Sequence, residues 1–194
     1  MVSVLAITSS PRRHGNSESA LDFILERLPQ NYAVEKIILN GIKVNVCKGC
    51  GFCEKTGDCI QKDDFIPLIE KIENCDVLIF ASPVYSMSVC AQGKALIDRC
   101  QVFWSRKYLL KTFSKGRGKA GLFISTAGQT RDNIFDHTVP VARFLFDVSG
   151  ISNKNTVLLL LKGLDDRNDF KKSEEAKSLA KISADELIQK IEAL

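Results

Sequence analysis

The chain has 194 residues, of which 45% are hydrophobic and 26% are charged. This length suffices for an α/β domain with a substantial core, and the composition is ordinary for a globular protein. The formal net charge of +4 is too small to indicate a nucleic acid or a membrane surface as partner. No apolar run approaches the length that spans a bilayer, and the N-terminus lacks the pattern of a signal peptide, so we expect a cytoplasmic protein.

Apolar segments alternating with helical patterns predict the fold class. The predicted strands are Val2–Ile7, Tyr32–Leu39, Val77–Phe80, Ala120–Ile124 and Thr156–Leu161. The predicted helices cover residues 20–28, 65–72, 91–104, 134–148 and 174–194. Strands this apolar are covered on both faces, so we predict an α/β fold with a doubly wound, five-stranded parallel sheet. No linker or repeat interrupts the pattern, which favours a single domain over residues 1–194.

A polar loop, Thr8–Ser19, joins the first predicted strand to the first predicted helix. It carries hydroxyl, amide and guanidinium side chains, and Gly15 permits close approach of the backbone. Free N–H groups at the start of a helix bind anions, so this loop suits a phosphate monoester. It matches neither the Walker loop nor the dinucleotide-binding glycine pattern.

Two further loops, Ser82–Val89 and Ser125–Asp132, follow the third and fourth predicted strands. Ligands of such sheets lie beyond the carboxyl ends of the strands, so all three loops are expected to meet around one ligand. Tyr85 offers a flat aromatic face, and the third loop is small and rich in hydroxyls. A phosphate at one end and a flat heterocycle at the other describe a mononucleotide.

A cysteine-rich loop at about 46–62 carries the second strong signal. Cys47, Cys50, Cys53 and Cys59 form the pattern C-x2-C-x2-C-x5-C, with glycines that let the backbone wrap closely. The first three match the run that holds iron–sulfur clusters, and the fourth is near enough that the loop alone could bind one [4Fe–4S] cluster. The alternatives are a structural zinc site, a redox dithiol and a reduced, metal-free loop. The remaining cysteines, at positions 75, 90 and 100, are expected to fill the core.

Two motifs resemble those of a known family. S-P-R-R-H-G-N-S, at 10–17, resembles the phosphate loop of the NADPH-dependent FMN reductases and their flavodoxin-like relatives, and the stretch at 82–99 resembles their ring-binding loop and following helix. The resemblance implies a flavodoxin-like strand order, 2-1-3-4-5, and bound FMN. The phosphate ligands that it implies are Ser10, Arg12, Asn16 and Ser17. The flavin-ring contacts that it implies are Pro83, Val84, Tyr85 and Ser86, with Thr126, Ala127 and Gly128 opposite.

Together with the cysteine motif, these features resemble the iron–sulfur flavoproteins of anaerobic archaea and bacteria. That family pairs one FMN with one [4Fe–4S] cluster per subunit and forms homo-oligomers. The resemblance implies an electron-transfer oxidoreductase, a homodimer or homotetramer. Its cluster would relay electrons from a ferredoxin-type donor to the flavin and then to a small acceptor such as oxygen, peroxide or a quinone. Because no Ser-His-Asp or paired-carboxylate pattern stands out, we expect the cofactors to carry the chemistry.

Two alternative functions stay open at this point. One is an NAD(P)H-dependent FMN or quinone reductase without a cluster, and the other is a flavodoxin-like electron carrier. The basic stretch Lys107–Lys119 is expected to be a solvated surface. Its alternative role is contact with a phosphate of NADPH or with an acidic electron-transfer partner.

Overall fold

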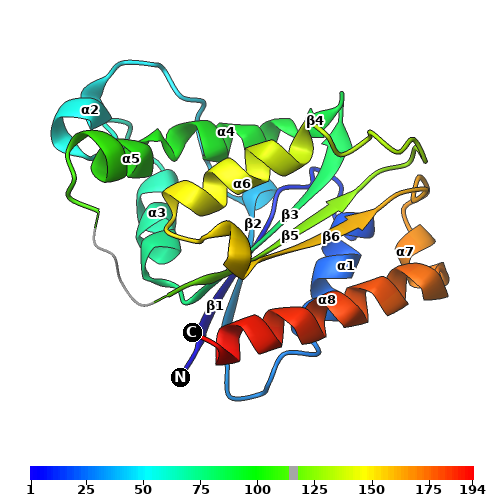
Figure 1. The fold of residues 1–194 in the computed structure, drawn as a ribbon. Helices are drawn as coiled ribbons and strands as arrows, with labels where there is room; N and C mark the ends of the chain where they lie inside the picture. The colour runs from blue at the N-terminus through cyan, green and yellow to red at the C-terminus, as the bar shows by residue number, and fades with distance from the viewer. Residues whose placement is uncertain (114–117) are drawn as a thin grey trace.

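The computed structural model describes residues 1–113 and 118–194. Within these residues, five parallel strands form the main sheet in the order β2-β1-β3-β5-β6 (Figure 1). The strands are β1 (Ser3–Thr8), β2 (Ala33–Ile38), β3 (Val77–Tyr85), β5 (Ala120–Thr126) and β6 (Thr156–Leu161). Counted over the parallel strands alone, this is the order 2-1-3-4-5, so the predicted flavodoxin-like fold class is confirmed.

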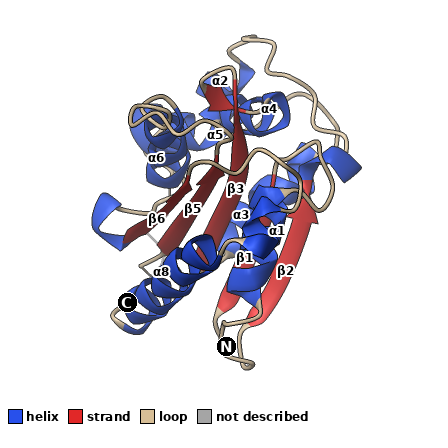
Figure 2. Ribbon diagram, turned by 90° about the vertical axis from the view of Figure 1, so that its right-hand side faces the viewer, coloured by secondary structure: helices blue, strands red, loops and turns tan. Residues whose placement is uncertain are grey.

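Helices cover both faces of the sheet (Figures 1 and 2). One face packs against α1 (Asn16–Leu25) and α8 (Glu174–Glu192), and the other against α3 (Phe65–Asn74), α4 (Ala91–Arg99), α5 (Gln101–Trp104) and α6 (Thr138–Val148). The alternation of side chains along β1 separates the two cores. Val4 and Ala6 face the first, whereas Leu5 and Ile7 face the second. The apolar stripe predicted for residues 65–72 is confirmed, because all four of its members are buried.

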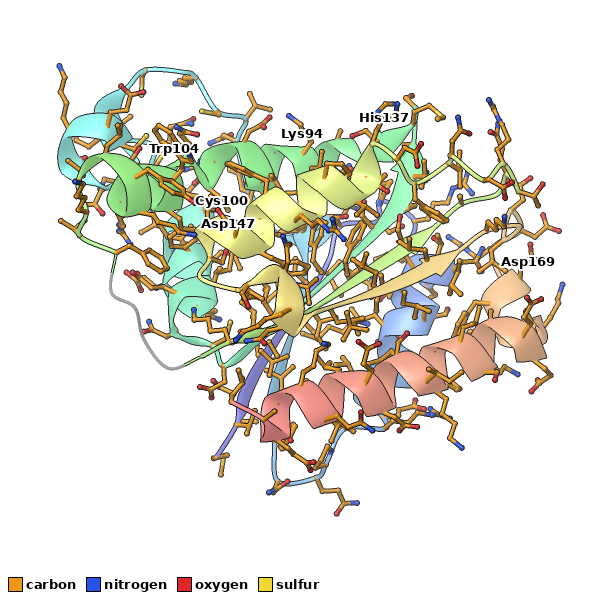
Figure 3. All side chains as sticks on the ribbon, in the orientation of Figure 1. Lys94, Cys100, Trp104, His137, Asp147 and Asp169 are labelled. Atoms are coloured by element: carbon orange, nitrogen blue, oxygen red, sulfur yellow. The ribbon has the colours of Figure 1, made fainter. Side chains whose placement is uncertain are left out.

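Short elements complete the chain. They are η1 (Leu39–Gly41), α2 (Phe52–Thr56), η2 (Ser105–Leu109, a π-helical turn), η3 (Asn153–Asn155), α7 (Asp169–Lys172) and β4 (Ser88–Val89), which pairs antiparallel with β3. Asp147 on α6, labelled in Figure 3, accepts hydrogen bonds from Lys107 and Tyr108 of η2 and so joins the two elements. Across residues 1–113 and 118–194, no helix is long and apolar enough to cross a membrane.

Several predicted boundaries are wrong, in ways that bear on the site. Helix α1 begins at Asn16, so the first loop is shorter than predicted. Strands β3 and β5 run on to Tyr85 and Thr126, because pairing with their neighbours continues beyond the apolar runs. Helix α6 begins only at Thr138, which puts Pro140 in its first turn, where a missing N–H is tolerated.

The basic stretch Lys107–Lys119 falls partly outside the described residues, at 114–117. At its two ends the lysines are not simply solvated. Lys107 pairs with Asp147 at 2.8 Å, and the Lys119 ammonium donates to the backbone carbonyls of Ile72 and Glu73 at 3.0 and 2.6 Å. These contacts give the two lysines structural roles beside α6 and α3.

Candidate functional site

A cavity of about 120 Å³ opens where β1, β3 and β5 end. Its lining consists of Ser10, Arg12, Gly15, Asn16, Ser17, Pro83, Val84, Tyr85, Thr126, Gly128, Leu164, Asp165 and Arg167. The structure thus brings the three predicted loops together, with all of the predicted FMN-contact residues except Ser86 and Ala127. Ser86 lies at a hairpin turn, and Ala127 is buried against Ile134 and Phe135.

Hydrogen bonds between its own residues hold the loop between β1 and α1. The Ser10 hydroxyl donates to the Arg12 carbonyl at 3.0 Å and accepts from the Arg12 N–H at 3.2 Å. A Cβ added to Gly15, the N-cap of α1, would lie 3.3 Å from the same carbonyl. Gly15 has no side chain that could cap the helix, so the first-turn N–H groups of α1 stay available for an anion at the cavity.

Glu18, in the first turn of α1, fixes the outer part of this loop. Its buried carboxylate accepts from the His14 N–H at 2.6 Å and pairs with Arg13 and Lys36 at 3.3 and 3.0 Å. Burial alone would raise the pKa of Glu18, but these hydrogen bonds and charges outweigh it and lower the pKa to about 2. Glu18 therefore engages Arg13, whereas Arg12, among the described residues, makes no ion pair and keeps its charge for a ligand.

Asn16 joins the cavity to a fourth segment that the sequence did not indicate. Its amide donates to the carbonyls of Leu164 and Asp166 at 3.0 and 2.8 Å, and its oxygen accepts from the Phe170 N–H at 3.0 Å. The side chain that the resemblance assigned to phosphate is thus engaged with the connection between β6 and α7. This connection brings Asp165 and Arg167 to the cavity.

The rule that places ligands at strand ends could have found this fourth segment. Residues 162–168 follow a parallel strand, as the three predicted loops do, and they carry charged side chains. The packing at Gly128 supports the close approach of this segment. A Cβ added there would lie 2.4 Å from Asp165 Oδ1. Gly128 therefore leaves the room that Asp165 occupies.

The predicted loop Ser82–Val89 is instead a β-hairpin formed by β3 and β4. Tyr85 pairs with Ser88, and the two residues between them, Ser86 and Met87, have φ values of 48° and 66°. Both central residues of a type I′ turn have positive φ, which is costly for residues other than glycine, asparagine or aspartate. The hairpin carries Tyr85, which is 37% exposed, at the edge of the cavity.

A second cavity, of about 430 Å³, lies beside α2 and the end of α4. All four motif cysteines line it, together with Arg99, Gln101 and Val102. The structure records all seven cysteines as free thiols, and Cys75, Cys90 and Cys100 are buried, as expected for core positions. We refer to this second cavity as the cysteine cavity.

The thiols surround the cysteine cavity and do not converge on one point. In the part of the chain that the structure describes, no group of three or more His, Cys, Asp or Glu side chains is placed to hold a metal ion. Gly49, Gly51 and Gly57 have φ values of 61°, 69° and 76°, and these left-handed positions let the loop turn around the cavity. Arg106 fastens the loop by donating to the Gly57 carbonyl at 2.7 Å and pairing with Asp58 at 2.8 Å.

Two sulfur atoms already accept hydrogen bonds. The Gly49 N–H lies 3.5 Å from Cys47 Sγ, and Arg99 Nη2 lies 3.3 Å from Cys59 Sγ. Donors aimed at sulfur stabilise negative charge on it, so the surroundings of both cysteines suit anionic thiolate ligands.

Solved structures of low sequence identity share the fold. The crystal structure of Smu.1420 from Streptococcus mutans UA159 superposes with a TM-score of 0.71 at 16% identity, covering 95% of this chain and 100% of that one. An FMN-dependent NADH-azoreductase from Bacillus anthracis, solved in complex with FMN, gives a TM-score of 0.64 at 15% identity, with coverages of 96% and 99%.

Curated relatives share more sequence over a shorter region. An iron–sulfur flavoprotein of Archaeoglobus fulgidus is 41% identical over 106 residues, which are 54% of this chain and 48% of that protein. An iron–sulfur flavoprotein of Methanosarcina thermophila is 30% identical over 126 residues, which are 64% and 63% of the two chains. The matched regions thus span about half to two thirds of these relatives.

Most of the chain also matches the sequence pattern of one protein family. The model of the family described as NADPH-dependent FMN reductase matches residues 2–150, a range that includes β1 to β5, the three predicted loops and the cysteine cavity. With the flavodoxin-like strand order and the cavity at the strand ends, this match establishes that the chain belongs to the NADPH-dependent FMN reductase family.

Proposed function

We propose that this chain is an FMN-dependent electron-transfer oxidoreductase that also binds a [4Fe–4S] cluster. The observation that carries the proposal is the pair of cavities in one chain, one built from phosphate-binding chemistry and the other lined by four cysteines. When bound, a cluster supplies one-electron transfer and FMN supplies both one- and two-electron transfer. The residues of the chain bind, orient and tune the two groups.

The first cavity fits the phosphate end of FMN. The Ser17 hydroxyl, the Arg12 guanidinium and the first-turn N–H groups of α1 form a donor set suited to a phosphate. Ser10 would join this set by turning its hydroxyl from the Arg12 carbonyl toward the phosphate. Its volume of about 120 Å³ is small beside the roughly 300–1,000 Å³ of small-molecule pockets. The flavin ring would therefore extend toward the rim, where the proposed contacts are Pro83, Val84, Tyr85 and Ser86, with Thr126, Ala127 and Gly128 on the other side.

The cysteine cavity fits a cluster by the chemistry of its donors. Cys47, Cys50, Cys53 and Cys59 would hold the iron atoms as thiolates, and the N–H groups directed at Cys47 and Cys59 would offset the negative charge of the sulfur atoms. The four thiols would need to move closer together on binding. Gly49, Gly51 and Gly57 have left-handed backbone conformations. Because glycine adopts a wide range of backbone conformations, such a movement of the loop is feasible.

The cysteine cavity includes Arg99 at the end of α4, whereas a Cβ added to Gly93, near the start of α4, would lie 3.0 Å from Ser9 Oγ in the first loop. The two cavities thus lie toward opposite ends of α4, whose nine residues correspond to about 14 Å of helix. We propose that the electrons come from a ferredoxin-type donor, pass one at a time through the cluster to FMN and leave to a small acceptor such as oxygen, peroxide or a quinone. We also propose a homodimer or homotetramer, in which the cysteine cavity of one subunit lies near the flavin of another. Exposed apolar side chains around the cysteine cavity, Val46, Phe52 and Ile60, favour such a covering partner.

A cluster-free NAD(P)H-dependent FMN or quinone reductase is the second candidate. It is favoured by the family description and by the dispersed thiols. The experiment that separates the two is purification under strictly anaerobic conditions, followed by iron, sulfide and flavin analysis and by steady-state assays with NADPH. About four iron atoms and one FMN per chain support the main proposal. An iron-free flavoprotein that oxidises NADPH rapidly supports the alternative.

Titration with riboflavin tests the phosphate site separately. Without the phosphate, the buried donors of the first loop stay unpaired, which costs about 1–3 kcal/mol for each group. We expect riboflavin to bind at least tenfold more weakly than FMN. Equal affinities would mean that the cavity at the start of α1 does not bind the phosphate.

A further inference from the structure

Arg99, the last residue of α4, is a fully buried cation. Its side chain is 0% exposed, and that of its partner Asp63 is 1% exposed. Arg99 Nη1 lies 2.7 and 2.5 Å from the two oxygens of the Asp63 carboxylate, and the guanidinium carbon lies 4.0 Å from the centre of the Phe65 ring. Both side chains of the ion pair are thus excluded from solvent and held in one geometry.

The other side of the same guanidinium faces the cysteine cavity. Arg99 Nη2 lies 3.3 Å from Cys59 Sγ, and both residues line the cavity. Arg99 Nε is buried and has no hydrogen-bond partner within the described ranges. Nη1 also donates to the Asn45 carbonyl at 3.5 Å, and Nη2 to the Gln61 carbonyl at 3.4 Å. The carboxylate thus lies at Nη1 and the sulfur at Nη2, so the positive end of the buried ion pair points at Cys59.

The pair also closes the loop that carries the cysteines. The Asp63 carboxylate accepts from the N–H groups of Asn45 and Phe65 at 2.9 and 3.2 Å, and so joins the two ends of the loop. Burial alone would raise the pKa of Asp63, but the hydrogen bonds from Arg99 and Asn45 outweigh it and hold the pKa below its usual value.

Closure of the loop does not by itself require charges. Replacing a buried ion pair by well-packed apolar side chains is often neutral or stabilising, whereas breaking it by removing one partner is costly. A neutral side chain with N–H groups could also donate to the loop carbonyls of Asn45 and Gln61, as Arg99 does. What it could not supply is a positive charge beside the sulfur of Cys59. Hydrogen bonds and charges at ligand sulfurs are among the factors that set the reduction potential of iron–sulfur clusters.

We propose that Arg99 is a positioning residue for the cluster, and that its charge and its hydrogen bond to Cys59 raise the cluster's affinity for an electron. Asp63 opposes this effect, because its negative charge lies on the far side of the guanidinium. The inference rests on the proposed function, since it requires a cluster held by Cys59. It predicts opposite effects from removing the two charges of a single ion pair.

The test is a redox titration of the anaerobically purified protein, followed by electron paramagnetic resonance. The variants are Arg99→Gln, Asp63→Asn, Arg99→Lys and the double variant Arg99→Gln/Asp63→Asn, each analysed also for iron and sulfide. Lys181→Gln is the control, because it removes an exposed positive charge from α8, which packs on the other face of the sheet. Such a charge is screened by solvent and should leave the potential near the wild-type value.

We expect Arg99→Gln to lower the reduction potential of the cluster by 59 mV or more. For one electron this is at least a tenfold decrease in the equilibrium constant for reduction. Asp63→Asn should shift the potential in the opposite direction, and the double variant should lie between the two. Arg99→Lys should stay closer to wild type than Arg99→Gln does. Arg99→Gln alone leaves the Asp63 carboxylate buried and unpaired. If this variant does not fold for that reason, the potentials of Asp63→Asn and of the double variant are compared, because these two differ only in the charge of Arg99.

Two outcomes separate a purely structural role of Arg99 from the absence of a cluster. If the wild-type protein carries a cluster and these variants leave its potential unchanged, or shift it in the same direction, Arg99 has only a structural role and the inference is overturned, while the proposed function stands. If the anaerobic wild-type protein contains no iron, the cluster and the inference both fall.

Discussion

Asn16 donates a hydrogen bond from its side-chain amide to the backbone carbonyl of Leu164, at 3.0 Å. The two residues lie 148 positions apart in the chain. Through this bond the start of α1 and the segment after β6 form one wall of the proposed FMN cavity. Any change in this contact should therefore alter flavin binding through the segment that carries Asp165 and Arg167.

Asn16→Asp should weaken FMN binding at least tenfold. The carboxylate cannot donate to the carbonyls of Leu164 and Asp166, and it adds negative charge beside the proposed phosphate position. Fluorescence titration of the apoprotein with FMN measures the effect. Asn74→Asp, an exposed change on α3, is the control and should keep the wild-type affinity. An unchanged dissociation constant for Asn16→Asp would place the phosphate elsewhere.

Gly128→Ala should reduce FMN affinity several-fold with a smaller effect on folding. The new methyl group would lie 2.4 Å from Asp165 Oδ1 and 3.1 Å from its Cβ, so the segment after β6 must move away from β5. Gly41→Ala is a matched control, because a Cβ added there meets nothing within 4 Å. The comparison combines FMN titration with urea unfolding of each variant. Equal FMN affinity in the two variants would show that the Asp165 segment takes no part in the site.

The protein should lose stability in acid as the Glu18 carboxylate becomes protonated. The pKa of Glu18 is lowered from 4.5 to about 2 in the folded state, so its contribution to stability is fully present above pH 4.5 and is lost as the pH falls toward 2. A lowering of the pKa from 4.5 to about 2 corresponds to about 3 kcal/mol. Glu18→Gln should lose about this much stability at pH 7 and much less near pH 2.5, as measured by urea unfolding at both values. An equal loss at both would contradict this role of the carboxylate, and exposed Glu26→Gln is the control.

The holoprotein should sediment as a homodimer or homotetramer. The apolar side chains exposed around the cysteine cavity include Phe52 at 37% and Ile60 at 52%. Phe52→Glu should shift the equilibrium toward monomer, because an interface that buries this ring would have to bury a charge. Ile182→Glu on α8, where the isoleucine is 60% exposed, is the control and should leave the assembly unchanged. A wild-type monomer in analytical ultracentrifugation with both cofactors bound would contradict the proposal.

The sequence predicted the framework well because the strands carry contiguous apolar runs. Strand β6 and the buried stripe of α3 lie where the pattern put them. The β3–β4 hairpin was missed because its turn, Ser86-Met87, lacks the asparagine and glycine that mark type I′ turns. The hydrogen bonds of Asn16 and the Arg99–Asp63 pair could not be predicted, because each joins segments far apart in the chain that no local pattern connects.

Iron and sulfide analysis of two cysteine variants tests whether one chain holds both FMN and a [4Fe–4S] cluster. Cys53→Ala removes a proposed ligand that lines the cysteine cavity, whereas Cys75→Ala removes a buried thiol from the core beside α3. Both variants are purified anaerobically beside the wild type, and FMN is measured in each.

We expect about four iron and four sulfide atoms per chain in the wild type and in Cys75→Ala, and loss of most of both in Cys53→Ala, which should keep its FMN. Loss of iron from Cys75→Ala but not from Cys53→Ala would mean that the ligands lie among the buried cysteines. A wild-type protein that contains FMN but no iron, or one zinc ion per chain, would rule out the cluster and leave the cluster-free reductase as the function.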